Sequence, residues 1–269
     1  MKAAAVQMTS GRDVQANLEQ ARGLLRDAAG AGAQLAVLPE NFAFLGATDA
    51  ERVAAAETVG QGPAQEFLAR QAEELRIWLV GGTIPIRDGH ARACSRSFLF
   101  APDGSSFAHY DKIHLFDVDI PGREAERYSE SATTLAGARV VVAQTPIGRI
   151  GMTVCYDIRF PGLFHRLSVQ GMDVLVVPAA FTQPTGRVHW QPLLQARAIE
   201  SLVYVVAAGQ CGEHAGGRRT YGHSMIVGPW GEVLAERADG PGVVCADLDI
   251  IGLAQLREKF PVIKHRREL

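Results

Sequence analysis

Hydrophobic and polar positions follow two alternating patterns along the first half of the chain. Three short apolar runs predict buried strands over residues 2–8, 34–38 and 77–84. Two segments between these runs carry apolar side chains at helical spacing and predict helices over residues 14–29 and 63–76. Residues 97–110 then predict a hairpin that turns at Pro102–Asp103–Gly104.

The second half repeats this plan. Apolar runs predict strands over residues 149–155, 173–178 and 202–210, and helical spacing predicts helices over residues 161–171 and 187–201. A second hairpin follows over residues 224–236, and then a last strand over 243–250 and a short helix to about Lys259.

The two halves can be aligned element by element. QLAVLPENF (34–42) matches DVLVVPAAF (173–181), and FLFAPDGSSFAHY (98–110) matches MIVGPWGEVLAER (225–237). Helices that alternate with apolar strands cover the outer faces of sheets, and hairpins make those sheets mixed rather than purely parallel. The pattern therefore predicts a four-layer α-β-β-α sandwich of two similar halves, which share one core in a single domain.

Composition narrows the class of protein. The 269 residues include 29 acidic and 27 basic side chains, and a net charge of −2 argues against nucleic-acid binding. No apolar run approaches the ~20 residues of a membrane span, and the N-terminus is too quickly polar for a secretory signal. The four cysteines form no C-x-x-C pair, so neither a disulfide framework nor a zinc site is expected. We expect a cytoplasmic protein without a metal site.

Glu40 is the first residue that could carry chemistry. It follows the apolar run 34–38, and open α/β sheets place ligands at the carboxyl ends of strands. A carboxylate beside Leu38 and Phe42 would be partly desolvated, which would raise its pKa toward the value that suits a general base. An acid that only meets solvent or caps a helix is the alternative, and for Glu40 taken alone it is the favoured one.

Cys155 and Lys112 are two further residues that could take part in catalysis. Cys155 ends the strand RIGMTVC just before a predicted helix, whose dipole could shift the thiol toward thiolate. The backbone N–H of Tyr156 could then face an oxyanion. Lys112 lies in the non-amphipathic segment 110–122 and could be a fixed cation. The alternatives are a small hydrophobic core residue for Cys155 and a solvated lysine for Lys112.

These segments, taken together, resemble the nitrilase superfamily of carbon–nitrogen hydrolases over essentially the whole chain. The resemblance is carried by the strand-end Glu40, by Y-D-K-I-H (110–114) and by G-M-T-V-C-Y-D-I-R-F-P (151–161). It implies that Glu40 is the general base, Lys112 the oxyanion-stabilising cation and Cys155 the nucleophile. The family's second glutamate matches Glu130, which without the resemblance would read as a solvated loop acid.

The resemblance also implies a reaction and a substrate class. It implies one carbon–nitrogen hydrolase domain over residues 1–269, assembled as a homodimer or higher oligomer, that hydrolyses a small-molecule amide to an acid and ammonia through a thioester. No metal or organic cofactor is required. Four segments are similar to the Nit-type branch, which acts on deaminated glutathione: 181–200, 204–214, 221–231 and 261–269.

Several questions of specificity stay open at this point. An ω-amidase acting on α-ketoglutaramate, an N-carbamoyl amidase, or a binding module on the same fold are alternatives. Arg159 and Arg187 are candidates for gripping a substrate carboxylate, because guanidinium binds carboxylate bidentately, and a structural ion pair is the alternative for each. Phe181 and Thr182, from the segment 181–200, complete the expected substrate-binding set.

Overall fold

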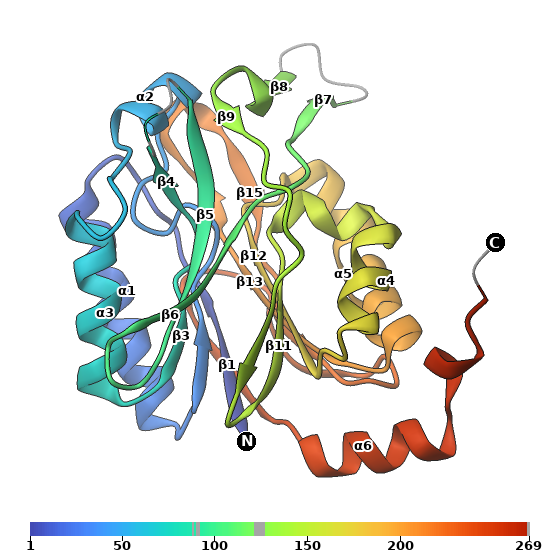
Figure 1. The fold of residues 1–269 in the computed structure, drawn as a ribbon. Coiled ribbons are helices and arrows are strands. Elements are labelled where there is room, and N and C mark those ends of the chain that lie inside the picture. Colours follow the sequence, from blue (N-terminus) through green and yellow to red (C-terminus); the bar gives the residue numbers. More distant parts are fainter. Residues whose placement is uncertain (88, 90–91, 121–126, 268–269) are drawn as a thin grey trace.

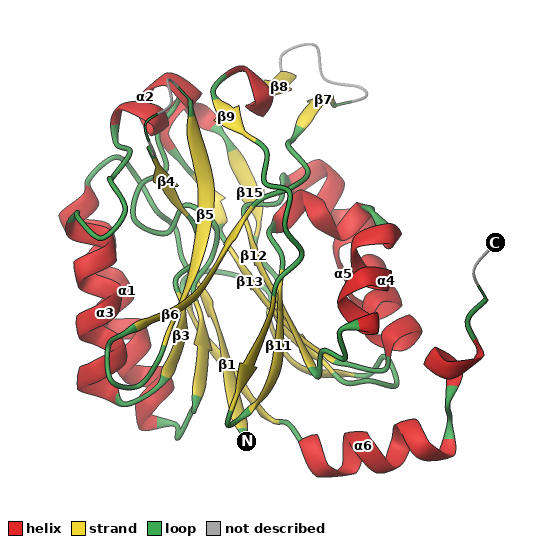
Figure 2. Ribbon diagram, viewed as in Figure 1, coloured by secondary structure: helices red, strands yellow, loops and turns green. Residues whose placement is uncertain are grey.

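The computed structural model describes residues 1–267 apart from 88, 90–91 and 121–126. Two β-sheets lie face to face and helices cover their outer faces (Figure 1). On one side the helices are α1 (Val14–Gly30) and α3 (Pro63–Leu75), and on the other they are α4 (Pro161–Val169) and α5 (Gln183–Ser201). Figure 2 shows the strands as an inner double layer between these helices. The predicted four-layer sandwich is confirmed.

The first sheet combines strands from both ends of the chain. Its order is β18 (Gly242–Asp247), β1 (Lys2–Gln7), β2 (Leu35–Val37), β3 (Trp78–Val80), β5 (Ala93–Phe100) and β4 (Ile84–Ile86). Two further strands, β6 (Ser106–Asp111) and β9 (Thr134–Leu135), also pair with β5. The pairs β1–β2 and β2–β3 are parallel, whereas β18–β1, β3–β5 and β5–β6 are antiparallel.

The second sheet repeats this topology. Its order is β10 (Val142–Thr145), β11 (Gly148–Met152), β12 (Val174–Ala179), β13 (Tyr204–Gly209), β16 (Ser224–Val227) and β17 (Val233–Arg237). The run β11–β12–β13 is parallel and continues antiparallel into β16 and β17, as β1–β2–β3 continues into β5 and β6. The two similar halves and the mixed sheets expected from the sequence are therefore present.

Strand β1 shows how the layers share a core. Its small side chains alternate, so that Ala3 and Ala5 join the cluster between the sheets while Ala4 and Val6 pack toward α1 and α3. All four are fully buried. The cluster between the sheets contains side chains from both halves of the chain, and β1 packs directly on β13.

Shorter elements complete the molecule. They are α2 (Asp49–Ala54), α6 (Ile250–Lys259), β7 (Asp117–Asp119), β8 (Arg127–Ser129), β14 (Cys211–Glu213), β15 (Arg219–Tyr221) and the 3-10 turns Glu130–Ala132, Cys155–Arg159, Ala215–Gly217 and Val262–His265. Within the described ranges, no helix combines the length and the apolar character needed to cross a membrane.

Two predicted strands end earlier than expected. The predicted strand 77–84 is interrupted after β3, because Gly82 takes a left-handed φ of +53° where a Cβ atom would lie 2.0 Å from the carbonyl oxygen of Pro39. The predicted strand 149–155 ends at Met152, and Cys155 begins a 3-10 turn instead. Both breaks lie beside residues that form the site described below.

Helix α5 begins four residues before the predicted start at 187. Thr182 is its N-cap residue and Pro184 lies in its first turn, where a proline costs no hydrogen bond. The sequence contains this start signal, although the apolar spacing on which the prediction rested begins later.

Candidate active site

Glu40 lies where the two sheets meet at the carboxyl ends of their strands. It follows β2, and its side chain is buried, with 4% of the residue exposed. Carboxylate Oε2 accepts a hydrogen bond of 2.8 Å from the backbone N–H of Ala180, which follows β12. One carboxylate thus joins corresponding strands of the two halves, and the alternative of a solvent-facing acid does not apply.

Lys112 is a buried cation between two carboxylates. Its Nζ lies 2.8 Å from Oε1 of Glu40 and 2.9 Å from Oε2 of Glu130, and 2% of the residue is exposed. Glu130 is fixed in turn, because it also accepts a hydrogen bond of 2.8 Å from the backbone N–H of Phe116. The solvated-lysine alternative is therefore excluded, and Glu130 is not a free loop acid.

Cys155 completes this group at the start of its 3-10 turn. The residue has a φ of +46°, a left-handed conformation that costs about 1–3 kcal/mol for a side chain other than glycine. Such strain concentrates at functional sites, where the surrounding structure enforces it. Cys155 lines the same cavity as Glu40 and Lys112, and it lies close enough to both for their charges to shift the pKa of its thiol.

Asp157 connects the segment that carries Lys112 to the segment that carries Cys155. Its fully buried carboxylate accepts hydrogen bonds from Tyr110 Oη (2.7 Å), from the backbone N–H of Val154 (2.9 Å) and from the backbone N–H of His114 (3.0 Å). The ring Nδ1 of His114 lies 2.7 Å from the same carboxylate. The sequence does not predict this role for Asp157, since nothing in Y-D-I-R (156–159) distinguishes it from a surface acid.

The pKa of Glu40 is lowered, whereas the sequence led us to expect a raised value. Burial raises its pKa, as predicted, but the charge of Lys112 and the hydrogen bond from Lys112 outweigh burial and hold the pKa below its ordinary value. For Lys112, burial lowers the pKa, while the charges of Glu130 and Glu40 raise it more, so the net pKa lies above its ordinary value. At neutral pH this pair is therefore a carboxylate and an ammonium ion.

The expected shift of the Cys155 thiol toward thiolate is also wrong for the resting site. Burial raises its pKa, the charge of Glu40 raises it further, and the charge of Lys112 opposes them only in part. The net pKa lies well above the ordinary thiol value. The resting site holds a protonated thiol beside a carboxylate that can accept its proton.

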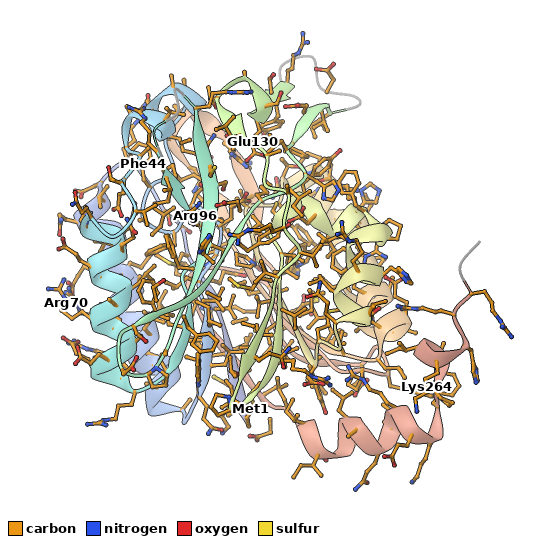
Figure 3. The ribbon with its side chains drawn as sticks, in the orientation of Figure 1. Met1, Phe44, Arg70, Arg96, Glu130 and Lys264 are labelled. Carbon is orange, nitrogen blue, oxygen red and sulfur yellow. The ribbon has the colours of Figure 1, made fainter. Side chains whose placement is uncertain are left out.

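A cavity of about 550 Å³ opens over these residues. Tyr156, Phe181 and Thr182 line it, as do the residues 44–48 that follow Glu40. Figure 3 shows Phe44 and Glu130 at the same end of the molecule. The volume of the cavity is within the ~300–1,000 Å³ range of small-molecule sites.

The two arginines predicted to hold a substrate carboxylate lie outside this lining. The Arg159 guanidinium packs over the rings of Phe181 (5.1 Å) and Tyr156 (5.9 Å), next to the cavity, and its Nη1 lies 3.3 Å from His189. Arg187 is exposed on the first turns of α5. Their predicted role stays a prediction.

Three other arginines line the cavity instead: Arg52, Arg127 and Arg218. None was singled out from the sequence, because they come from three separate segments and belong to no motif. Among the described residues, no cluster of histidine, cysteine and acidic side chains could hold a metal ion.

The arrangement has the parts of an acyl-transfer site. A thiol can attack, an adjacent carboxylate can take its proton, and a fixed ammonium ion can stabilise the negative charge that develops on a carbonyl oxygen. The site lies in a cavity large enough for a small organic substrate.

Comparison with known proteins agrees with this chemistry. A family model described as carbon-nitrogen hydrolase matches residues 2–258. The "Deaminated glutathione amidase" of Synechocystis sp. is 42% identical over 268 residues, which cover 98% of this chain and 97% of that protein.

Solved structures show the same fold. The crystal structure of the C. elegans NitFhit protein superposes with a TM-score of 0.91 at 38% identity, over 99% of this chain and 65% of that one. A variant of the amidase from Nesterenkonia sp. AN1, whose active-site cysteine has undergone Michael addition of acrylamide, superposes with a TM-score of 0.78 at 28% identity. That superposition covers 97% of this chain and 98% of the amidase.

Proposed function

The chain belongs to the carbon–nitrogen hydrolase family and hydrolyses amides, and from this we propose that its substrate is deaminated glutathione. The relative from Synechocystis sp. that is 42% identical over nearly the full length carries this activity in its name. The observation that carries the proposed mechanism is the buried cluster in which Lys112 Nζ lies 2.8 Å from Glu40 Oε1, with Cys155 lining the same cavity.

In the proposed acylation step, Glu40 takes the proton of the Cys155 thiol as the sulfur attacks the amide carbon. The C–S bond forms and the carbonyl oxygen becomes an oxyanion, which Lys112 and the backbone N–H of Tyr156 stabilise. Glu40 then gives its proton to the leaving nitrogen, the C–N bond breaks, and a thioester remains on Cys155.

Deacylation uses the same groups in the reverse order. Glu40 takes a proton from water as the water oxygen attacks the thioester carbon, and the second oxyanion is held by the same donors. The C–S bond then breaks, the acid leaves, and Glu40 returns the proton to the sulfur. Glu130 keeps Lys112 in place at a distance of 2.9 Å throughout, which makes it a positioning residue.

The leaving group depends on the substrate. Primary amides and carbamoyl compounds release ammonia, as expected from the family resemblance. Deaminated glutathione is glutathione with an oxo group in place of the α-amino group, so one of its amide bonds joins the oxo acid to the nitrogen of cysteine and the other joins cysteine to glycine. Its hydrolysis therefore releases an amine, and an assay that follows ammonia alone would miss it.

The test is a substrate panel read by mass spectrometry. Deaminated glutathione, α-ketoglutaramate, glutamine, an N-carbamoyl amino acid and a simple nitrile are each incubated with the wild type and with Cys155→Ser. We expect the highest kcat/KM for deaminated glutathione, a covalent acyl adduct on Cys155, and no turnover in the variant. A preference for α-ketoglutaramate or the carbamoyl compound would move the assignment to those branches, and silence across the panel would refute it.

A cytoplasmic location and a homodimeric or higher assembly are further parts of the proposal. Three exposed apolar side chains that lie together support self-association: Ile199, Trp230 and Phe260. Light scattering coupled to size exclusion tests the assembly, and cell fractionation tests the location. A monomer at micromolar concentration would contradict the first, and recovery with membranes would contradict the second.

A further inference from the structure

Arg218 reaches the active-site cavity from the second half of the chain. It lies in the connection between β14 and β15, directly after Gly216 and Gly217, and all three residues line the cavity. The backbone of this connection is fixed at its two ends, because the His214 N–H donates to the Arg218 carbonyl at 2.8 Å. The Arg218 side chain therefore starts from an anchored backbone beside the cavity.

The guanidinium also has fixed neighbours that place it close to the reacting groups. Its Nη2 donates a hydrogen bond of 3.0 Å to the carbonyl oxygen of Ala180, the residue whose N–H binds Glu40. Its carbon Cζ lies 5.3 Å from the ring centroid of Tyr128, two residues before Glu130. The positive charge of Arg218 is near enough to Glu40 to help lower the pKa of that carboxylate.

One donor of this guanidinium is not satisfied. The Nε atom is buried and has no hydrogen-bond partner among the described residues. A buried donor without a partner costs about 1–3 kcal/mol, so such groups are uncommon in folded proteins and call for a specific explanation, such as a bound ligand. The other two arginines of the lining have partners: Arg52 donates to Thr134, and Arg127 pairs with Asp119 at 3.4 Å.

The cavity as a whole favours anions. Its described lining contains four cationic side chains against two carboxylates: Arg52, Lys112, Arg127 and Arg218 against Glu40 and Glu130. The chain itself has a net charge of −2, so the positive excess is local. Deaminated glutathione has two carboxylates and no ammonium group, whereas glutathione retains its ammonium. The loss of that group makes the ligand a better electrostatic match to this cavity.

We propose that Arg218 is a specificity-determining residue that binds a carboxylate of the substrate away from the scissile amide, so that the site selects anionic amides. The inference rests on the proposed function for the identity of the amide. The planar guanidinium offers its unsatisfied Nε and a neighbouring N–H as a pair of donors that match a carboxylate. Either end of deaminated glutathione, the oxo acid or the glycine, could supply that carboxylate.

The competing explanation is that Arg218 only braces the cavity wall through Ala180. The two explanations differ in what a substitution does to different ligands. If Arg218 only stabilises the cavity wall, its substitution changes the affinity of every ligand of the cavity to a similar extent. A carboxylate-binding residue affects only ligands that carry the carboxylate it binds.

The experiment measures binding in a Cys155→Ala background by titration calorimetry, so that it does not depend on turnover. Three ligands are compared: deaminated glutathione, its C-terminal glycinamide, and 4-oxopentanoyl-cysteinylglycine, which lacks the carboxylate at the oxo acid end. Arg218→Gln is added to the background, and Arg219→Gln serves as the matched control. Arg219 is the exposed neighbour whose guanidinium pairs with Glu213 at 2.8 Å.

We expect Arg218→Gln to weaken the Kd for deaminated glutathione by about 10- to 100-fold, the value of charge-assisted hydrogen bonds. It should weaken one of the two analogues by less than about 3-fold, well below one tenfold step of Kd. That analogue identifies the carboxylate that Arg218 binds. Arg219→Gln should leave all three Kd values unchanged.

Equal weakening of all three ligands, or no weakening of any, would overturn the proposal. Unfolding temperatures of the variants confirm that each is folded. Failure of the proposed function is seen separately, as absence of turnover in the wild-type enzyme, while Kd values still report on Arg218.

Discussion

Replacing Asp157 with asparagine should shift both Cys155, the proposed nucleophile, and Lys112, the proposed oxyanion-binding cation. The carboxylate of Asp157 accepts hydrogen bonds from Tyr110 Oη, from the backbone of Val154 beside Cys155, and from the backbone of His114 near Lys112. One oxygen serves Tyr110 and Val154, and the other serves His114. An amide keeps one of these oxygens and presents an NH₂ group in place of the other.

The magnitude follows from the donors that lose their acceptor. In one orientation the NH₂ group faces the backbone N–H of His114, and in the other it faces Tyr110 Oη and the N–H of Val154. One or two buried donors are left unpaired, at about 1–3 kcal/mol each, so we expect a loss of about 1–6 kcal/mol in the free energy of unfolding. At roughly 2 °C per kcal/mol for a chain of this size, Tm should fall by about 2–12 °C.

The effect on catalysis is separate from the effect on stability. A shift of about 1 Å between Cys155 and Lys112 would cost about 10² in kcat. Calorimetry gives Tm, and kcat is measured well below the Tm of the variant. The matched control is Asp173→Asn, because this carboxylate binds Arg149 and Arg257 at the opposite end of β12. The control should lose stability but keep kcat.

The result that would refute this reasoning is Asp157→Asn with Tm within about 1 °C of the wild type and an unchanged kcat. A fall in Tm with an unchanged kcat would also contradict it, since Asp157 would then stabilise the fold without positioning the reacting groups. Both outcomes are read directly against Asp173→Asn.

Four further predictions concern the site. Lys112→Gln should lower kcat by about 10²–10³ and move the acid limb of the kcat/KM profile to higher pH, because the largest opposition to the rise that burial causes in the pKa of Glu40 is then gone. An unmoved limb would contradict this. Glu40→Gln should increase the rate at which iodoacetamide alkylates Cys155 at pH 7, as measured by mass spectrometry. The reason is that the carboxylate that raises the pKa of the thiol is gone while Lys112 remains. A slower alkylation rate would contradict this prediction. The pKa of Glu40 in the folded protein is lowered, so its pair with Lys112 should stabilise the fold at pH values above the ordinary carboxyl pKa of about 4.3. This stability should be lost as the pH falls through the pKa of the folded state. The denaturant midpoint should therefore fall on acidification by less in Lys112→Gln than in the wild type. Gly82→Ala should cost about 1–3 kcal/mol and lower kcat, because its Cβ would push on Pro39 next to Glu40; a variant with wild-type stability would show that the loop yields freely.

Much of the fold could be predicted because its signals are local. Strand β2 is an apolar run that leads to Pro39, strand β12 is an apolar run that contains Pro178 near its end, and the two prolines align between the halves. Helix α3 opens on Pro63, and α5 would have been placed correctly had Thr182 been read as its cap. These features depend on neighbours within a few residues, which a single sequence displays.

The electrostatics of the site could not be predicted in this way. The pKa of Glu40 depends on Lys112, which is 72 residues away, and that of Cys155 depends on both. Desolvation alone predicts a raised pKa for Glu40, and a helix dipole alone predicts a lowered pKa for Cys155. In both residues the net pKa shift has the opposite direction. Arg218 was missed for the same reason, since only folding brings it near Glu40.

The pairing of β18 with β1 has a consequence for how the protein is made. All six residues of β1 pair with β18, and the Met1 ammonium donates to the carbonyl of Leu248, 247 residues away. A ribosome adding ~5–20 residues per second exposes β1 for about 10–50 seconds before its last partner is synthesised. During that time the first sheet has an open apolar edge, the kind of surface that pairs with other chains. We therefore expect nascent chains that stop before Gly242 to need chaperone protection, and full-length chains to be released from it.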